Sequence, residues 1–306
     1  MTARQEKPKI LITGSNGLLG QKMAQVAGAD YWRVGVDLQD ESLSSADEYL
    51  RLDITGREEV LETIARIRPA AVINTAALTN VDACEKEREL AWAVNVEGVR
   101  HLLEACQKVG GHLIHLSSDY VFDGEAGPYE PDAEPNPLGY YGLTKLESEK
   151  VVAGSPGPWT VVRTNVLYGW APQVRANFAL WVHSLLSAKK YIRAAIDQYG
   201  NPTLVDNLAE GILSILRGGH RGIFHIAGGD YMSRWAFALK TATVFEFNHE
   251  LIAPVLSSKL SQRAPRPHWG GLRIDTAVDK LGFVPLGVQR GLEILKAQMS
   301  QKEMEV

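Results

Sequence analysis

The sequence has few cysteines and no long apolar run, and each shortage excludes a class of protein. Only Cys84 and Cys106 are present among 306 residues, and they lack the Cys-x-x-Cys spacing of a metal site. We expect both to be reduced thiols, with Cys106 on a helix. No apolar stretch reaches the roughly 18 residues that a membrane-spanning helix needs. The polar residues 1–7 leave no room for a signal peptide before the first apolar stretch.

An excess of positive charge is also absent. The formal net charge is −4, from 32 basic and 36 acidic side chains, which does not indicate nucleic-acid binding. The composition, 45% hydrophobic and 22% charged, is ordinary for a chain long enough to bury a sizeable core. We therefore expect a soluble, cytoplasmic protein with one large domain or two unequal ones, bound to neither membrane nor nucleic acid.

Strand and helix patterns alternate through the first half of the chain. Apolar runs typical of strands occupy residues 9–13, 31–36, 70–73 and 112–116, and helical spacing lies between them at 18–26, 57–67 and 83–109. Such alternation predicts a parallel sheet with helices on both faces, the doubly wound α/β class. Residues 119–138 are rich in Gly, Pro, Asp and Glu, and so long a loop in a compact domain is usually functional.

The second half is less regular. A helix at 141–152 and a strand at 160–164 continue the first pattern, and after Gly169 we expect helices at 177–188, 204–216, 233–246 and 287–301 and a strand at 222–226. This favours a smaller C-terminal α/β lobe whose elements interleave with the first domain.

A glycine motif follows the first predicted strand and opens the first predicted helix. It reads Thr13-Gly14-Ser15-Asn16-Gly17-Leu18-Leu19-Gly20, in the setting of a dinucleotide-binding fingerprint. Gly14 allows a tight turn, Gly17 lets a pyrophosphate approach the backbone, and Gly20 lets the helix pack closely. The pyrophosphate would lie on free N–H groups at the helix start. A glycine-rich turn without a ligand is the alternative, but the position favours a cofactor held by residues 14–20.

Two acids follow the next predicted strands. Asp37 ends the second strand, about 20 residues after the glycines, where an acid hydrogen-bonds the ribose hydroxyls of NAD. Its charge repels a 2′-phosphate and favours NADH over NADPH, although Arg33 or Arg51 would still admit the phosphate, and a simple loop acid is the other interpretation. Asp53 follows an apparent third strand and either faces the adenine or is an ordinary turn residue.

Tyr141 and Lys145 are four residues apart, so on a helix both lie on one face. The charge of Lys145 and of a cofactor ring would lower the phenol pKa from about 10. Ser118 and Asp119 follow the strand at 112–116, at the carboxyl end where ligands of open α/β sheets bind. A Tyr-x-x-x-Lys match alone arises easily by chance. Together, the serine, phenol and lysine beside a nicotinamide predict a carbonyl-reducing site, in which Asp119 orients substrate or cofactor.

Residues 251–274 contain no acidic side chain but include Lys259, Arg263, Arg266 and Arg273. Guanidinium groups match phosphate oxygens, so this stretch is a candidate seat for a diphosphate, with Trp269 stacked on a base. A solvated basic loop or an oligomer contact is the alternative. Further candidates for substrate binding in the second lobe are Arg175 and Asn177.

These residues resemble the extended short-chain dehydrogenase/reductases. The resemblance makes 13–20 the cofactor motif and Ser118, Tyr141 and Lys145 the catalytic residues. It also implies that Asn95 supports the lysine through water, and that Ala76 and Ala77, in the run 74–77, line the nicotinamide-side ribose. By sequence alone, Asn95 is equally compatible with an ordinary polar position on a helix.

Within that superfamily the chain most resembles the dTDP-4-dehydrorhamnose reductase family. The matching runs span residue 9 to about 285 and include 117–124, 134–142, 177–178, 197–203 and 263–267. The resemblance implies a Rossmann domain over residues 1–170, which binds NADH or NADPH, and a sugar-nucleotide lobe over 171–306. It also implies reduction of the C4 ketone of dTDP-4-dehydro-L-rhamnose.

Two departures leave the sugar open. Val166 stands where these reductases commonly carry a tryptophan that packs on the sugar, and Gly270 stands where they usually show serine. Another nucleotide-sugar reductase, epimerase or dehydratase is one alternative. The other is a regulatory NAD(P)-binding subunit like the methionine adenosyltransferase β-subunit, which shares the 117–124 run. In the family that the chain resembles, some members use Mg²⁺ at a dimer contact, so the resemblance suggests a homodimer. The sequence itself shows no metal cluster and no ligands to place.

Overall fold

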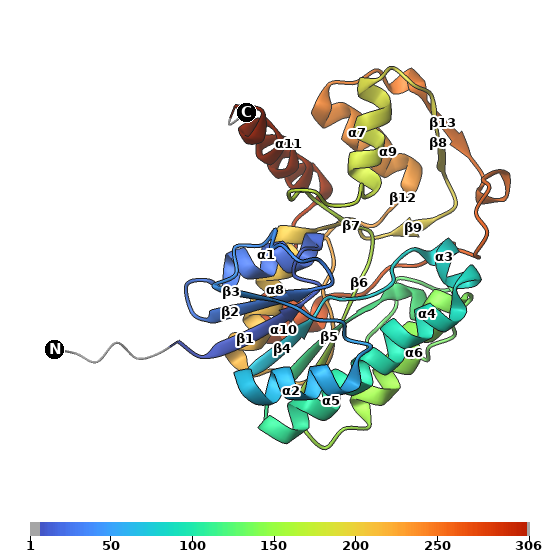
Figure 1. Ribbon diagram of the computed structural model, residues 1–306. Coiled ribbons are helices and arrows are strands. Elements are labelled where there is room, and N and C mark those ends of the chain that lie inside the picture. The colour runs from blue at the N-terminus through green and yellow to red at the C-terminus, as the bar shows by residue number, and fades with distance from the viewer. Residues whose placement is uncertain (1–6, 305–306) are drawn as a thin grey trace.

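The structure, a computed structural model, describes residues 7–304, and a seven-stranded sheet forms its centre (Figure 1). All strands run parallel in the order β11-β6-β5-β4-β1-β2-β3, which confirms the expected doubly wound sheet. The strand order reverses between β1 and β4, where such sheets bind ligands. The strands are β1 (Lys9–Thr13), β2 (Trp32–Asp37), β3 (Glu48–Arg51), β4 (Ala71–Asn74), β5 (His112–Ser118), β6 (Trp159–Thr164) and β11 (Gly222–His225).

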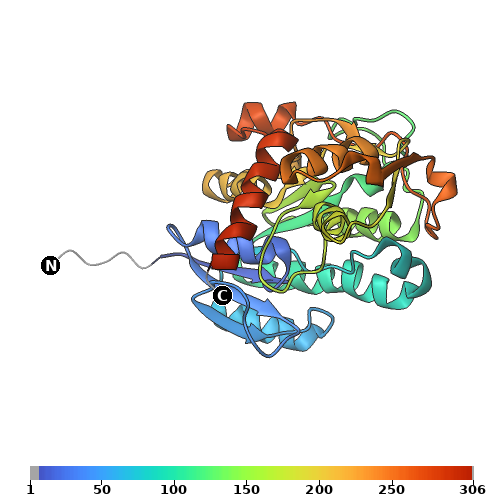
Figure 2. The same cartoon turned by 90° about the horizontal axis from the view of Figure 1, so that it is seen from above.

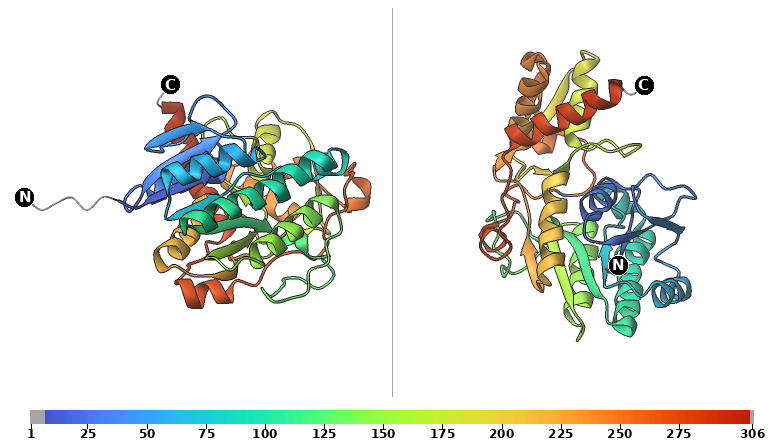
Figure 3. Two further views of the ribbon diagram at one scale, coloured as in Figure 1. Left: turned by 60° about the horizontal axis from the view of Figure 1, so that its bottom comes forward. Right: turned by 90° about the vertical axis from the view of Figure 1, so that its left-hand side faces the viewer.

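Helices cover both faces of this sheet. Successive side chains of a strand point to opposite faces, and in β1 apolar side chains are buried on both faces. Ile10 and Ile12 pack with α1 (Leu18–Ala27), α8 (Val205–Gly218) and α10 (Asp275–Leu281). Leu11 packs with α2 (Arg57–Ile67), α5 (Gly98–Val109) and α6 (Tyr140–Ala153). The left view of Figure 3 shows α2, α5 and α6 side by side across that second face.

The single helix predicted at 83–109 is interrupted in the structure. It consists of α3 (Val81–Lys86), α4 (Arg88–Trp92), a π-helical turn η1 (Ala93–Glu97) and α5. The break falls at Glu87, which leaves the helical region with φ −109° and ψ 52°. Its neighbours are good helix formers, so propensity does not reveal the break. Both cysteines are buried and unpaired, and Cys106 lies on α5, as expected.

A smaller lobe lies above the sheet in Figure 1. Its helices are α7 (Phe178–Ser187), α9 (Arg234–Phe245) and α11 (Val288–Met304), close to the predicted ones. The sequence does not predict its short paired strands, which are β7 (Leu167–Tyr168) with β10 (Thr203–Leu204), β9 (Tyr199–Gly200) with β12 (Met232–Ser233), and β8 (Ile192–Ala195) with β13 (Ile252–Val255). Short 3₁₀ turns complete the chain as η2 (Asp119–Val121), η3 (His249–Leu251) and η4 (Ser257–Lys259).

The chain passes between lobe and sheet more than once. β11, α8 and α10 follow residue 170, yet they complete the sheet and its cover. α11 reaches back from the lobe toward α8, where Gln298 donates a hydrogen bond to Asp206 at 2.9 Å (Figure 2). Within residues 7–304, none of the helices combines the length and the apolar character that crossing a membrane requires.

Candidate active site

The turn between β1 and α1 has the geometry that its glycines predict. Gly14 lies in the left-handed region at φ +63°, and a Cβ there would lie 2.9 Å from the Ala76 backbone nitrogen. A Cβ on Gly20 would lie 2.2 Å from the Gly14 carbonyl oxygen, so α1 packs this closely because glycine stands there. The start of α1 carries neither a capping side chain nor an acid in its first turn. Its free N–H groups therefore fit a diphosphate.

Asn16 fastens the segment after β2 to this turn. Its side-chain amide donates to the Gln39 Oε1 and the Glu41 carbonyl, both at 2.8 Å, and accepts from the Leu43 N–H at 2.8 Å. Its backbone N–H donates to Asp37 Oδ2 at 2.9 Å. Asp37 thus lies at the end of β2 and against the glycine turn. Ser15 and Leu19 are buried under the turn and Leu18 is half-buried.

The other residues proposed for the adenosine end of the cofactor differ in how far hydrogen bonds and ion pairs within the fold already occupy their side chains. Arg33 is engaged by both Asp47 oxygens, at 2.7 and 2.8 Å. Arg51 faces Asp37 in the strand register and makes only a 3.4 Å contact with Asp40, so it is the freer of the two arginines. Asp53 is exposed and accepts from the N–H and hydroxyl of Thr55, at 2.9 and 2.8 Å, the contacts of a turn residue. An adenine contact by Asp53 stays a prediction.

Tyr141 and Lys145 lie together on the buried side of α6. Their exposed fractions are 9% and 2%. The Tyr141 phenol is hydrogen-bonded to the Ser118 side chain, and Lys145 Nζ lies 3.5 Å from His115 Nε2. Ser118 and His115 both belong to β5. The serine, phenol and lysine therefore gather at the carboxyl end of β5, as the sequence predicts.

Burial is the largest influence on both titratable groups. It raises the pKa of the Tyr141 phenol, against the hydrogen bond with Ser118, which lowers it. It lowers the pKa of Lys145 to about 8, against the charge of Glu149. The direction for Tyr141 is opposite to the expected lowering, because the loss of hydration disfavours the phenolate. In this structure the phenol is therefore held protonated, the form that a proton donor needs.

Asp119 connects the catalytic strand to two other segments. The Ser118 hydroxyl donates to Asp119 Oδ1 at 3.2 Å, and Asp119 Oδ2 accepts from Asn165 Nδ2 at 2.9 Å and the Gly271 N–H at 3.2 Å. Burial raises the pKa of Asp119. Of the two partners of Asp119 Oδ2, Asn165 follows β6 and Gly271 belongs to residues 263–273, a segment that we call the strap. Asn165 was not predicted, because no local pattern marks it and only the sheet brings it to Asp119.

Asn95 lies on the π-helical turn and clamps the segment after β4. Its side-chain oxygen accepts from the Leu78 N–H at 2.8 Å, and its nitrogen donates to the Leu78 carbonyl at 3.1 Å and to Thr144 Oγ1 at 3.0 Å. Thr144 immediately precedes Lys145. Asn95 therefore ties the chain after Ala76 and Ala77 to the catalytic helix, and π-turns are frequent at functional sites.

Pairing within the fold reduces the free charge of the strap. Arg266 donates to Asp82 Oδ1 at 3.1 Å and to the Ala264 carbonyl at 2.8 Å, and Arg273 pairs with Asp275 at 3.0 Å. Trp269 is 47% exposed and stacks on Tyr199, with ring centroids 4.5 Å apart. The strap thus offers an aromatic face beside Asp119 and fewer unpaired cations than its sequence predicts.

The two candidates on the lobe have different surroundings. Asn177 caps α7, since its side chain accepts from the Leu180 N–H at 3.3 Å and donates to the Gly169 carbonyl at 2.7 Å. Its local contacts give it a structural role, and a contact with substrate stays a prediction. Arg175 is exposed on the loop before α7.

Arg234 is a candidate that sequence reasoning missed. It opens α9, and its guanidinium lies 5.4 Å from the centre of the Phe178 ring. Its positive charge acts on the buried Asp119 and Tyr120, lowering their pKa values against the larger effect of burial. Among the described side chains it has no ion-pair partner. Arg234 is half-buried, lies near the catalytic strand and forms no ion pair among the described side chains. Such a guanidinium is suited to binding an anionic group of a substrate.

Both departures from the family pattern lie beside this site. Val166 has φ +45°, a strained conformation for a β-branched residue. A Cβ on Gly270 would lie 2.9 Å from Asp119 Oδ2, so a serine there would displace the strap or the acid. The strap therefore approaches Asp119 closely because glycine stands at 270.

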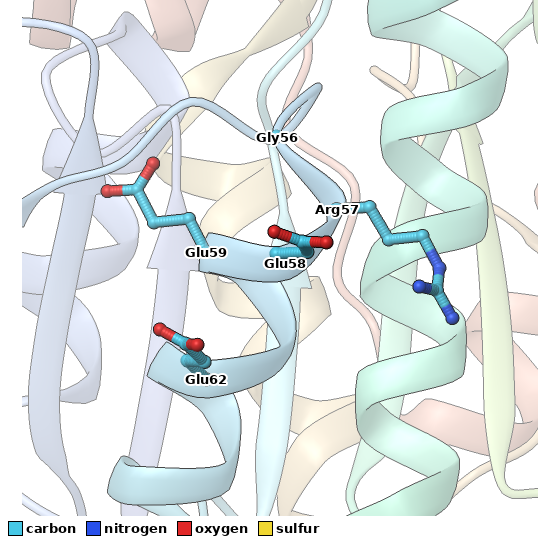
Figure 4. A pocket seen from close by; sticks show the side chains of 5 residues that line it. All are labelled: Gly56, Arg57, Glu58, Glu59 and Glu62. Atoms are coloured by element: carbon cyan, nitrogen blue, oxygen red, sulfur yellow. The ribbon is translucent and has the colours of Figure 1, made fainter.

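A separate hollow at the start of α2 is lined by Gly56, Arg57, Glu58, Glu59 and Glu62 (Figure 4). Arg57 points away toward α5, where it pairs with Glu104. The hollow lies at a helix start, and none of the candidate site residues lines it. Across the described part of the chain, no three His, Cys, Asp or Glu side chains gather as metal ligands would.

Comparison with known proteins gives matches over nearly the whole chain. The family model of the RmlD substrate binding domain matches residues 8–300. A dTDP-4-dehydrorhamnose reductase of Mycobacterium tuberculosis is 34% identical over 89% of this chain and 86% of that protein. A dTDP-4-keto-6-deoxy-D-glucose reductase of Streptomyces niveus is 31% identical over 90% and 92%.

A solved structure also matches at nearly full length. The dTDP-4-dehydrorhamnose reductase of Bacillus anthracis, in complex with NADP, superposes with a TM-score of 0.86 at 29% identity, covering 95% of this chain and 99% of that one.

Proposed function

The chain belongs to the family of the RmlD substrate binding domain, and from this premise we propose that it reduces the C4 ketone of dTDP-4-dehydro-L-rhamnose to dTDP-L-rhamnose. It is an NAD(P)H-dependent oxidoreductase, as its relatives are. The observation that carries the proposal is the meeting of Ser118, Tyr141 and Lys145 beside β5. A regulatory subunit has no need of all three.

The protein's own groups handle the proton and the developing charge. The reduced nicotinamide supplies the hydride that adds to C4 of the sugar. Tyr141 gives its phenolic proton to the carbonyl oxygen, so that the ketone becomes a secondary alcohol. Ser118 donates a hydrogen bond to the same oxygen while it gains negative charge. Lys145 favours the phenolate that remains and holds the nicotinamide ribose.

The glycine turn is suited to the dinucleotide. The uncapped N–H groups of α1 and the close backbone at Gly14 and Gly17 leave room for a pyrophosphate. In this proposal residues 14–20, Asp53, Ala76, Ala77 and Asn95 surround the cofactor. Residues 171–306 supply most of the sugar-nucleotide lobe.

We expect NADH to be preferred, because the Asp37 carboxylate at the end of β2 repels a 2′-phosphate. The change Asp37→Asn keeps a side-chain oxygen of the same reach to accept from the Asn16 N–H and removes the charge. It should raise the ratio of kcat/KM for NADPH over NADH at least about tenfold, which is about 1.4 kcal/mol. Steady-state kinetics with both coenzymes measure this ratio. A wild-type preference for NADPH, or an unchanged ratio, would contradict this role of Asp37.

The substrate's diphosphate and base have candidate partners in the lobe. Arg234 offers a guanidinium near Asp119, and Trp269 offers its ring face beside the strap. The remaining residues proposed for substrate binding are Arg175, Asn177 and Arg266. Arg266 contributes by holding the strap to Asp82.

Arg234→Met should raise the dissociation constant of thymidine diphosphate about tenfold or more, because a charge-assisted hydrogen bond to a phosphate is lost. Calorimetry measures this directly. Arg290→Met is the matched control, since Arg290 is an exposed partner of Glu293 on α11 and such pairs contribute little. Equal affinities in both variants would remove Arg234 from the site.

A different dTDP-4-ketosugar is the second candidate substrate. It is favoured by Val166, which provides no aromatic ring at the position where family members commonly pack tryptophan on the sugar. The chemistry at Tyr141 would be the same. Comparing kcat/KM for dTDP-4-dehydro-L-rhamnose and dTDP-4-keto-6-deoxy-D-glucose decides between the two.

Assembly and metal form a separate part of the proposal. We propose a homodimer with Mg²⁺ at its contact, as the family resemblance suggests. The mass in solution, measured by light scattering with Mg²⁺ and with EDTA, tests it. A monomer under both conditions would rule the dimer out.

The central experiment follows the loss of reduced-nicotinamide absorbance with dTDP-4-dehydro-L-rhamnose. Turnover supports the reductase. Tight NAD(P)H binding without turnover on either ketosugar would favour the regulatory subunit.

A further inference from the structure

A buried chain of hydrogen bonds runs under the site from the glycine turn to the catalytic helix. Thr13 Oγ1 lies 2.6 Å from Asn74 Oδ1, and Asn74 Nδ2 lies 3.1 Å from His115 Nδ1. His115 Nε2 lies 2.9 Å from Ser148 Oγ, which is 2.7 Å from the Lys145 carbonyl oxygen. All five side chains are at most 2% exposed. The proposed reduction uses none of the three middle residues.

The donors of this chain all point in one direction. The Thr13 hydroxyl has one proton, and it donates to Asn74 Oδ1. The Asn74 amide nitrogen is then turned to His115, so His115 Nδ1 accepts. At the other end Ser148 donates its single proton to the Lys145 carbonyl, so its oxygen accepts from His115. Both ends of the chain therefore require the same form of His115, neutral with its proton on Nε2.

Lys145 lies beside this imidazole but gains no acceptor from it. Its Nζ is 3.5 Å from His115 Nε2, whose proton points to Ser148. The other titratable groups that act on Lys145 are Glu149 on the same helix and Cys84 on α3. Burial, together with the charge of Lys145, holds the pKa of His115 well below its usual value. The imidazole is thus kept from becoming a second cation beside the lysine.

We propose that His115 is a positioning residue for Lys145. Held neutral and Nε2-protonated by Asn74 and Ser148, it occupies the inner side of the lysine without accepting from it. The ammonium of Lys145 is thereby left for the roles proposed above, toward the Tyr141 phenolate and the cofactor ribose. Because the same chain begins at Thr13, it also links the glycine turn to the catalytic helix. The inference rests on the proposed role of Lys145 in the reduction.

The tautomer is measured without any turnover. In ¹⁵N-labelled protein, long-range ¹H–¹⁵N correlations identify which ring nitrogen of a histidine carries the proton. We expect His115 to stay neutral and Nε2-protonated between about pH 6 and 9, with and without NADH. The change His115→Asn assigns the signal. An Nδ1-protonated ring, or one that becomes charged in this range, would overturn the inference while leaving the proposed reductase intact.

A pair of variants tests the effect on the lysine. In His115→Gln the side-chain amide reaches the position of Nε2 and offers Lys145 a hydrogen-bond acceptor. In His115→Asn the shorter amide still accepts from Asn74 but does not reach Lys145. We expect the basic limb of kcat/KM to move up by about one pH unit in the Gln variant only. If the basic limb of the pH profile of kcat/KM stayed at its wild-type position in both variants, His115 would not act through Lys145.

The two proposals fail in different ways. Retention of turnover in Tyr141→Phe contradicts the proposed acid and leaves the His115 tautomer untouched. A wrong tautomer contradicts only the role of His115.

Discussion

Tyr141→Phe is expected to lower kcat at least about a hundredfold, the usual worth of a positioned general acid. The ring of Tyr141 is buried and meets Tyr120 edge-on at 5.6 Å. Phenylalanine keeps this packing and removes only the hydroxyl that hydrogen-bonds Ser118. The affinity for NADH and the thermal midpoint should therefore stay close to those of the wild type. Stopped-flow turnover together with equilibrium titration of NADH measures both quantities.

Tyr140→Phe is the matched control for this change. Tyr140 precedes Tyr141 on α6 and is covered by Arg88, 4.8 Å from its ring centre. Losing its hydroxyl should leave turnover within about twofold. If Tyr141→Phe retained wild-type turnover, or if both variants lost it equally, the assignment of the acid would be wrong.

Gly20→Ala is expected to produce the largest effect on cofactor binding. Its Cβ would lie 2.2 Å from the Gly14 carbonyl oxygen and 2.6 Å from Ser15 Cα. Both neighbours are backbone, so α1 and the glycine turn must move apart. Overpacking of this kind costs about 1–3 kcal/mol or more. A shift in the turn should raise the NADH dissociation constant at least about tenfold, as titration calorimetry measures.

Gly157→Ala is the control for the glycine change. A Cβ at this position would meet only side-chain atoms, at 3.5 Å and beyond. Its stability and NADH affinity should match those of the wild type within experimental error. An unchanged NADH affinity in Gly20→Ala would mean that the turn does not hold the dinucleotide.

The sequence predicts well those parts of the site that one short segment builds. The glycine turn and the Tyr141–Lys145 pair are local, because a turn and one helix fix their geometry. The carboxyl ends of parallel strands share one edge of the sheet. For this reason, the strand pattern predicts Ser118 at the edge of the sheet where it contacts Tyr141.

Contacts between distant segments were beyond sequence reasoning. Asn165 reaches Asp119 because β6 lies beside β5, and Arg234 approaches it from the lobe. His115 reads as one residue of a strand, and only the sheet and α6 bring Asn74 and Ser148 to its two nitrogens. No spacing in the sequence marks Asn165, Arg234 or His115 as part of the site.

Charge patterning predicts more free cations in residues 251–274 than the structure contains. Residues 251–274 contain no acid in the sequence, yet Arg266 is paired with Asp82, far away in the chain, and Arg273 with Asp275, just beyond the stretch. The pairing of cations depends on neighbours that the linear sequence does not display. The break at Glu87 is not predicted either, because its neighbours are good helix formers.

The most direct test of the account is the fate of a deuterium label. The protein is incubated with dTDP-4-dehydro-L-rhamnose and NADH that carries deuterium at both positions of nicotinamide C4, and the product is examined by NMR. The account predicts dTDP-L-rhamnose with deuterium at sugar C4, formed by the wild type and at least about a hundredfold more slowly by Tyr141→Phe. Bound NADH with no labelled product, from this substrate or from dTDP-4-keto-6-deoxy-D-glucose, would contradict it.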